Sequence, residues 1–174
     1  AVPPKRTDYI ELRARSAFSF LEGASNPEDL VERGASLGYP ALALADRGGV
    51  YGAPRFHLAA RRAGLQAILG AEVDLDTGGD AQNPNTRLLL LVESSAGWRG
   101  LCRLLTLGHR GRDKNECRVD WNQLEEYAQD LTLLLRGDHR LTPGLLDRAQ
   151  SLFGKSPARL WVDVSRHLDR RAET

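Results

Sequence analysis

Short apolar runs alternate with longer amphipathic segments along almost the whole chain, and this alternation limits the folds open to it. In the amphipathic segments, apolar residues recur at the spacing of a helix with one buried face. Near-continuous apolar strands separated by such helices indicate a parallel sheet covered by helices. The sequence therefore predicts an α/β fold with about six strands, at residues 9–12, 40–45, 66–75, 87–93, 130–137 and 158–165.

Capping residues mark the ends of the predicted helices. Asn26 can cap a helix that begins at Pro27, and Gly38 can end it. A second helix is predicted from about Ala53 to Ala63, with Gly64 as its stop. Two further helices are predicted at residues 95–109 and 141–154.

Length and composition favour one globular domain. The chain has 174 residues, of which 41% are hydrophobic and 27% charged, as is usual for a domain with its own core. No apolar run approaches the ~20 residues that span a bilayer, and the first residues lack the apolar core of a secretory signal. We therefore expect a cytoplasmic protein that does not contact a membrane. Cys102 and Cys117 are too few for a disulfide framework and are not spaced as a metal pair, so we expect free thiols.

A basic stretch, HRGRDKNECR, occupies residues 109–118. The formal net charge of the chain is only +1, so no overall field demands a nucleic-acid partner. Two interpretations stay open for this loop. It is either a solvated insert or a contact to a DNA phosphate backbone through Arg110, Arg112 and Lys114.

Charged residues gather at the predicted strand ends. In α/β folds, functional side chains collect at the carboxyl ends of the strands, so we expect these residues to converge on one site. Solvated strand-end charges and an arginine clamp for a phosphate are the alternatives. The residues are Arg13, Arg15, Asp46, Arg47, Glu72, Arg166 and His167.

Four segments, in order, resemble the motifs of a known family. They are ELRARSAFSFLEGAS at 11–25, the stretch from PALALADRGG to LGAEV at 40–73, LLLLVESSAGWRGLCRLLT at 88–106 and WVDVSRHLDR at 161–170. Together they resemble the polymerase and histidinol phosphatase (PHP) domain. The resemblance is strongest to the PHP domain of bacterial DnaE-type DNA polymerase III alpha subunits of the error-prone kind.

The resemblance implies a distorted (βα) barrel, and residues 1–174 are then a single PHP-like domain that stops before the last barrel elements. Active family members hold zinc or manganese at the strand ends and hydrolyse phosphoesters with metal-activated water. Carried over by position, Arg13, Arg15 and Arg47 stand where the family has ligand histidines. The other positions of the degenerate metal site are Glu22, Asp46, Glu72, Arg87 and His167.

Arginine has no lone pair to donate near neutral pH and cannot be a metal ligand. We therefore expect no metal cofactor in this chain. Guanidinium groups can instead pair with the remaining carboxylates. The sequence predicts that Arg13, Arg15 and Arg47 form ion pairs with Glu22, Asp46 and Glu72.

Two functions are consistent with these residues. The first is a non-catalytic structural or interaction domain of an error-prone DnaE-type polymerase, acting in damage-tolerant DNA synthesis. Its expected partners are the remainder of the polymerase, mutagenesis accessory proteins or the replication clamp. The alternative is a residual metal-dependent phosphoesterase or 3′–5′ proofreading exonuclease. The polymerase palm is absent from these residues, so we expect either a piece of a larger polymerase or a truncated relative.

Overall fold

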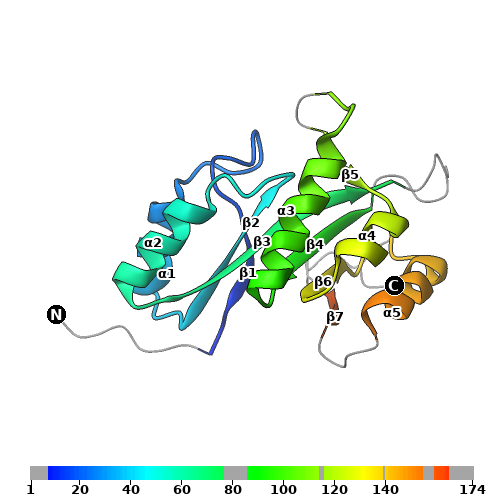
Figure 1. The fold of residues 1–174 in the computed structure, drawn as a ribbon. Coiled ribbons are helices and arrows are strands. Elements are labelled where there is room, and N and C mark those ends of the chain that lie inside the picture. Colours follow the sequence, from blue (N-terminus) through cyan, green and yellow to red (C-terminus); the bar gives the residue numbers. More distant parts are fainter. Residues whose placement is uncertain (1–7, 77–85, 114–115, 139, 155–158, 165–174) are drawn as a thin grey trace. The chain divides into compact units, whose positions relative to one another are not determined.

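The computed structural model describes residues 8–76, 86–113, 116–138, 140–154 and 159–164 (Figure 1). The chain divides into two compact units, residues 1–72 and residues 73–174. Strand β3 (Gln66–Leu75) carries the chain from the first unit into the second. Within the described residues, every helix is too short or too polar to cross a bilayer.

The first unit is a parallel βαβαβ arrangement. Strands β1 (Glu11–Ala14), β2 (Ala41–Arg47) and the first part of β3 pair in that order. Helices α1 (Pro27–Ser36) and α2 (Ala53–Ala63) pack against each other, and α1 also packs on β2. Strand β2 is buried along all but its last residue, which explains its unbroken run of alanine and leucine. The core of this unit consists of Val31, Leu42, Leu44, Phe56, Ala60 and Leu65.

Both predicted helices of the first unit are confirmed, with their ends. Pro27 is the first residue of α1, directly after the N-cap Asn26, where its missing N–H costs nothing. Helix α2 ends at Gly64, whose φ of 68° lies in the left-handed region and is readily adopted by glycine.

Within the described residues, the second unit contains the remaining strands and three helices. Strand β4 pairs with β6, β6 pairs with β7, and the two-residue β5 pairs with the end of β3. Helix α3 packs against β4, β5 and α4, while α5 packs against β7. The elements are β4 (Arg87–Val92), α3 (Ser95–His109), β5 (Arg118–Val119), α4 (Trp121–Tyr127), β6 (Leu131–Arg136), α5 (Pro143–Phe153) and β7 (Leu160–Asp163).

The structure corrects two expectations about this unit. The prediction of a wholly parallel sheet is wrong, because β4 runs antiparallel to β6, with Leu88 opposite Leu135. Leucine-rich strands are buried in either direction, so their apolar pattern indicates burial and not strand direction.

The sequence also left β5 and α4 unpredicted, and the described residues contain seven strands where about six were expected. A signal for α4 was present, since Asp120 and Gln123 form a capping box at its start.

Candidate functional site

Two arginines at the end of β1 and one glutamate in the part of β3 that belongs to the first unit form ion pairs. Arg13 Nη1 donates to Glu72 Oε1 over 2.7 Å, and Arg15 Nη2 donates to Glu72 Oε2 over 2.5 Å. The side chain of Glu72 is only 1% exposed. A carboxylate removed from water needs such charge-assisted hydrogen bonds to remain ionised at low cost. Arg13 and Arg15 therefore act together on one buried acid, as their i, i+2 spacing predicts.

A second glutamate continues this network. Arg15 Nη1 lies 2.8 Å from Glu22 Oε2, and Arg47 Nη1 lies 2.9 Å from Glu22 Oε1. Arginines and glutamates thus alternate in the order Arg13, Glu72, Arg15, Glu22, Arg47. We call these five residues the arginine–glutamate cluster. Each glutamate accepts from two guanidinium groups, so the predicted ion pairs of Glu22 and Glu72 are confirmed.

Asp46 takes a different role from the predicted one. We expected an arginine partner, but its carboxylate accepts three hydrogen bonds from two serines. Ser16 N–H donates to Oδ1 over 2.7 Å, Ser16 Oγ donates to Oδ2 over 2.8 Å, and Ser19 Oγ donates to Oδ1 over 2.7 Å. The three bonds satisfy a side chain in a residue that is 1% exposed. Asp46 therefore fastens the loop after β1 to the end of β2.

Sequence reasoning missed Ser16 and Ser19. In the structure, both serines are fully or almost fully buried. The signal that could have found them is the pair of hydroxyl residues three apart within the apolar stretch SAFSFL. Buried hydroxyl groups need partners, and Asp46 at a neighbouring strand end supplies one. Their bonds bring the loop back over β2, where Glu22 reaches the arginines.

Gly23 permits the close turn that places Glu22. Its N–H donates to the Ser19 carbonyl over 2.9 Å. A Cβ atom at this position would lie 2.1 Å from the Ser16 carbonyl oxygen, closer than any real contact. Only glycine therefore allows the backbone of the loop to fold back on itself here.

The donor set of the cluster does not suit a multi-metal centre. The carboxylates of Glu22 and Glu72 are occupied by guanidinium groups, and arginine nitrogens cannot replace the missing ligands. Within the described residues, no group of three or more His, Cys, Asp or Glu side chains could hold a metal ion. His167, with Arg166, falls outside these residues, so its predicted place as a ligand histidine stays a prediction.

The other predicted site residues lie in the second unit. Arg87 is the first residue of β4, and its Nε lies 3.5 Å from Asp74 Oδ1. In the basic loop, Arg110 is exposed, while Arg112 Nη2 is 2.7 Å from Asp76 Oδ2. Lys114 is outside the described residues. The contact of this loop with DNA therefore stays a prediction.

Both cysteines are free, as expected. Burial raises the pKa of the Cys117 thiol to about 11, and burial also raises the pKa of Cys102. A thiol needs its thiolate form to act as a nucleophile or metal ligand. Neither cysteine is therefore a candidate for catalysis near neutral pH.

Sequence comparison finds a matching family model and similar proteins. Residues 11–170 match the family model described as PHP domain. The chain is 54% identical over 91% of its length to an error-prone DNA polymerase of Anaeromyxobacter sp. (strain K), of which it spans 14%. It is 44% identical over 69% of its length to an error-prone DNA polymerase of Mycobacterium tuberculosis (strain ATCC 25618 / H37Rv), of which it spans 11%.

Solved structures share the fold at low sequence identity. An amidohydrolase from Chromobacterium violaceum, solved with bound sulfate and no metal, superposes with a TM-score of 0.63 at 14% identity, over 87% of this chain and 75% of that one. A two-domain Bacteroides vulgatus protein containing a predicted PHP-like metal-dependent phosphoesterase gives a TM-score of 0.55 at 12% identity, over 82% of this chain and 41% of that one. These likenesses support the predicted α/β fold.

Proposed function

Because this chain belongs to the PHP domain family, we propose that it is a non-catalytic PHP domain of an error-prone DNA polymerase, with a structural or interaction role in damage-tolerant DNA synthesis. The arginine–glutamate cluster carries this proposal. The chain spans 14% of the length of the Anaeromyxobacter relative, in keeping with a part of a larger DnaE-type polymerase. DNA synthesis itself would then belong to the rest of that polymerase, in the cytoplasm.

In the proposed role, the guanidinium groups of the cluster take the place of bound metal ions. Three arginines and two glutamates give the cluster a formal charge of 3 − 2 = +1, and Asp46 beside it brings the sum to zero. A metal ion that entered would have to displace guanidinium groups from both glutamates. Hydrolysis also needs a metal-bound water, which this donor set would not hold. The cluster therefore supports a role in stability and not in catalysis.

Exposed apolar side chains next to the cluster support an interaction role. Phe20 is 71% exposed, Leu21 90% and Tyr51 66%, and the rings of Phe18 and Tyr51 are 6.4 Å apart. A group of large apolar side chains facing water is typical of a surface that another protein covers. In the proposal, the rest of the polymerase, a mutagenesis accessory protein or the replication clamp covers it.

The residual phosphoesterase or proofreading exonuclease is the second candidate. The phosphoesterase named in the Bacteroides structural neighbour favours it, as does the acidic residue retained at Glu72. The occupation of Glu72 by two arginines opposes it. Manganese- or zinc-dependent hydrolysis of p-nitrophenyl phosphate or of mismatched primer ends by the wild-type chain would favour this candidate and contradict our proposal.

The proposal is tested by restoring histidines. We expect the triple variant Arg13→His, Arg15→His, Arg47→His to bind Zn²⁺ or Mn²⁺ at least ~10-fold more tightly than wild type in calorimetric titrations, because imidazole supplies the lone pairs that guanidinium lacks. The control is a triple variant at exposed arginines on three separate helices, Arg62→His, Arg99→His and Arg148→His. It should leave metal affinity unchanged.

Circular dichroism shows whether the triple variant folds. If it does not, the single variant Arg47→His serves, because Arg47 is the most exposed arginine of the cluster at 39%. Equal metal affinity of wild type and a folded histidine variant would contradict the idea that arginine substitution removed the metal site.

A further inference from the structure

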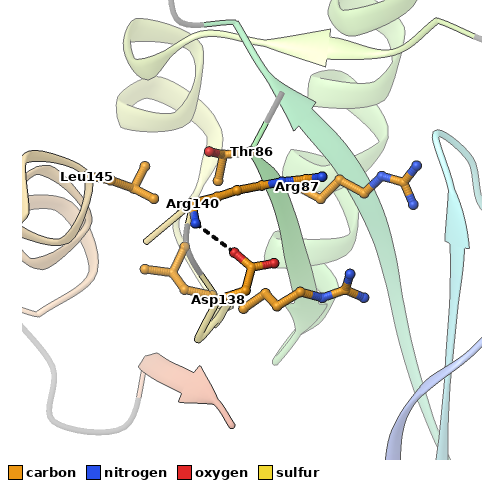
Figure 2. A pocket seen from close by; sticks show the side chains of 7 residues that line it. Thr86, Arg87, Asp138, Arg140 and Leu145 are labelled. Atoms are coloured by element: carbon orange, nitrogen blue, oxygen red, sulfur yellow. Dashed lines mark hydrogen bonds between the residues drawn. The ribbon is translucent and has the colours of Figure 1, made fainter. Parts of the chain in front are cut away.

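A separate arginine-lined pocket lies in the unit of residues 73–174, between the start of β4, the end of β6 and the start of α5 (Figure 2). The antiparallel pairing of β4 and β6 sets Leu88 opposite Leu135, and so brings Arg87 to the end of β6 that carries Arg136. The pocket has apolar walls at Leu135 and Leu145. Its polar lining consists of Thr86, Arg87, Arg136, Asp138 and Arg140.

Positive charge exceeds negative charge in this lining. Arg87, Arg136 and Arg140 contribute three positive charges and Asp138 one negative charge, so the sum over the lining is 3 − 1 = +2. Asp74, outside the lining, lies 3.5 Å from Arg87 Nε and reduces this sum to 2 − 1 = +1. Asp138 Oδ1 accepts the backbone N–H of Arg140 over 2.9 Å, the bond drawn in Figure 2. The acid is thus bonded to the backbone of its own loop, in contrast to the glutamates of the arginine–glutamate cluster.

Thr86 supplies a second, independent indication of a ligand. The residue lines the pocket and is only 6% exposed, and its Oγ1 is buried without a hydrogen-bond partner in the described structure. Its carbonyl accepts the Leu75 N–H over 2.8 Å, which fixes the position of its backbone. A buried hydroxyl without a partner is costly, and a bound acceptor in the pocket would satisfy it.

We propose that this pocket binds a phosphate group. Guanidinium groups suit phosphate oxygens because they offer paired donors in a plane, and the Thr86 hydroxyl adds one more donor. The cavity measures about 190 Å³, which is below the ~300–1,000 Å³ of sites that enclose drug-sized ligands. The pocket therefore takes an inorganic phosphate or the terminal phosphate of a larger molecule. This proposal uses none of the five residues of the arginine–glutamate cluster, but it does use Arg87, which is one of the predicted positions of the degenerate metal site.

The test is calorimetric titration of the chain with inorganic phosphate and pyrophosphate. Arg140→Gln should weaken binding at least ~10-fold, because it removes a charge-assisted hydrogen bond. Thr86→Val should weaken binding several-fold while the fold persists, because the valine removes a hydroxyl that has no protein partner. Arg148→Gln is the matched control: it removes one exposed arginine of α5 outside the pocket lining and should change affinity less than about two-fold.

The source of the phosphate is distinguished by comparing deoxyadenosine monophosphate with deoxyadenosine and with inorganic phosphate. Tighter binding of the monophosphate assigns the pocket to a phosphomonoester, and equal binding assigns it to free phosphate. Equal weakening by Arg140→Gln and Arg148→Gln would overturn the proposal. So would an unchanged affinity in Thr86→Val, or no binding by wild type at millimolar concentrations of either anion.

Discussion

The chain contains two arginine-rich regions that differ in their supply of carboxylates. In the arginine–glutamate cluster, each glutamate accepts from two arginines. In the pocket of the second unit, the charged lining consists of three arginines and one aspartate, and the aspartate bonds to a backbone N–H, while Arg87 lies 3.5 Å from Asp74. The comparison shows that arginine content alone does not define a role. The ratio of carboxylates to arginines decides whether the guanidinium groups stabilise the fold or can receive a ligand.

Burial also separates the Arg13–Glu72–Arg15 part of the cluster from the two exposed arginines of the pocket, whereas Arg47 and Arg87 are 39% and 26% exposed. Arg13 and Arg15 have side chains only 16% and 20% exposed, against a glutamate that is 1% exposed. Arg136 and Arg140 of the pocket are exposed. Breaking a buried pair leaves a charge without compensation, whereas an exposed charge keeps its water. The same change of charge should therefore have different results in the two regions.

The largest effect is expected for Glu72→Gln in the cluster. The substitution removes the carboxylate that Arg13 and Arg15 share and leaves two partly buried guanidinium groups facing a neutral amide. We expect a loss of about 3–5 kcal/mol in the free energy of unfolding, measured by urea denaturation followed by circular dichroism. A change below about 1 kcal/mol would show that the cluster is not a stabilising network, and would remove the contrast with the pocket.

The next effect concerns ligand binding and is a gain. In the pocket, Asp138→Asn should strengthen the binding of an anion. The asparagine keeps an oxygen that can accept the Arg140 N–H, while the lining charge rises from +2 to +3. We expect phosphate or pyrophosphate to bind about 3- to 10-fold more tightly, because a nearby like charge is worth on the order of 1 kcal/mol at the protein surface. Calorimetric titration checks this value.

Weaker binding in the Asp138→Asn variant would mean that the aspartate organises the pocket and does not oppose the anion. In that case the arrangement of the arginines would depend on carboxylates in both regions. The ratio of carboxylates to arginines would then not explain the difference between the regions.

The smallest effect is expected at an exposed ion pair that serves as a reference for both regions. Arg55 donates to both oxygens of Glu28, over 2.7 and 2.8 Å, and the two side chains are 50% and 43% exposed. The hydrogen bond from Arg55 lowers the pKa of Glu28 from its ordinary value of 4.5. A lowered pKa in the folded state means that the pair stabilises the fold above pH 4.5 and that this contribution is lost as the pH falls through the folded-state pKa.

Glu28→Gln should therefore shift the urea midpoint slightly at pH 7, and this shift should shrink as the pH falls through the folded-state pKa of Glu28. The shift at pH 7 should be far smaller than that of Glu72→Gln, because exposed pairs are screened by water and salt. Equal shifts for the two variants at pH 7 would show that burial does not distinguish the cluster from a surface pair.

Most of the secondary structure could be predicted from local patterns. The bounds of α2 at Ala53 and Ala63 and of β3 at Gln66 and Leu75 agree with the predicted ones, because proline, glycine and apolar periodicity act within a few residues. The pairing of Arg13 with Glu72, 59 residues apart, followed from the parallel order of β1, β2 and β3. The serine partners of Asp46 did not follow. Successive strand residues point to opposite faces, so Asp46 and Arg47 reach different parts of the loop after β1.

By itself, the sequence determined the alternation of strands and helices, the motifs of the family and the arginines that stand at ligand positions. Each of these depends on residue type and spacing along the chain. Only the tertiary structure decided that β4 runs antiparallel to β6, that Ser16 and Ser19 hold Asp46, and that Thr86 lies among three arginines with its hydroxyl buried. These depend on strand direction and on distances between segments remote in the chain, which apolar periodicity does not encode.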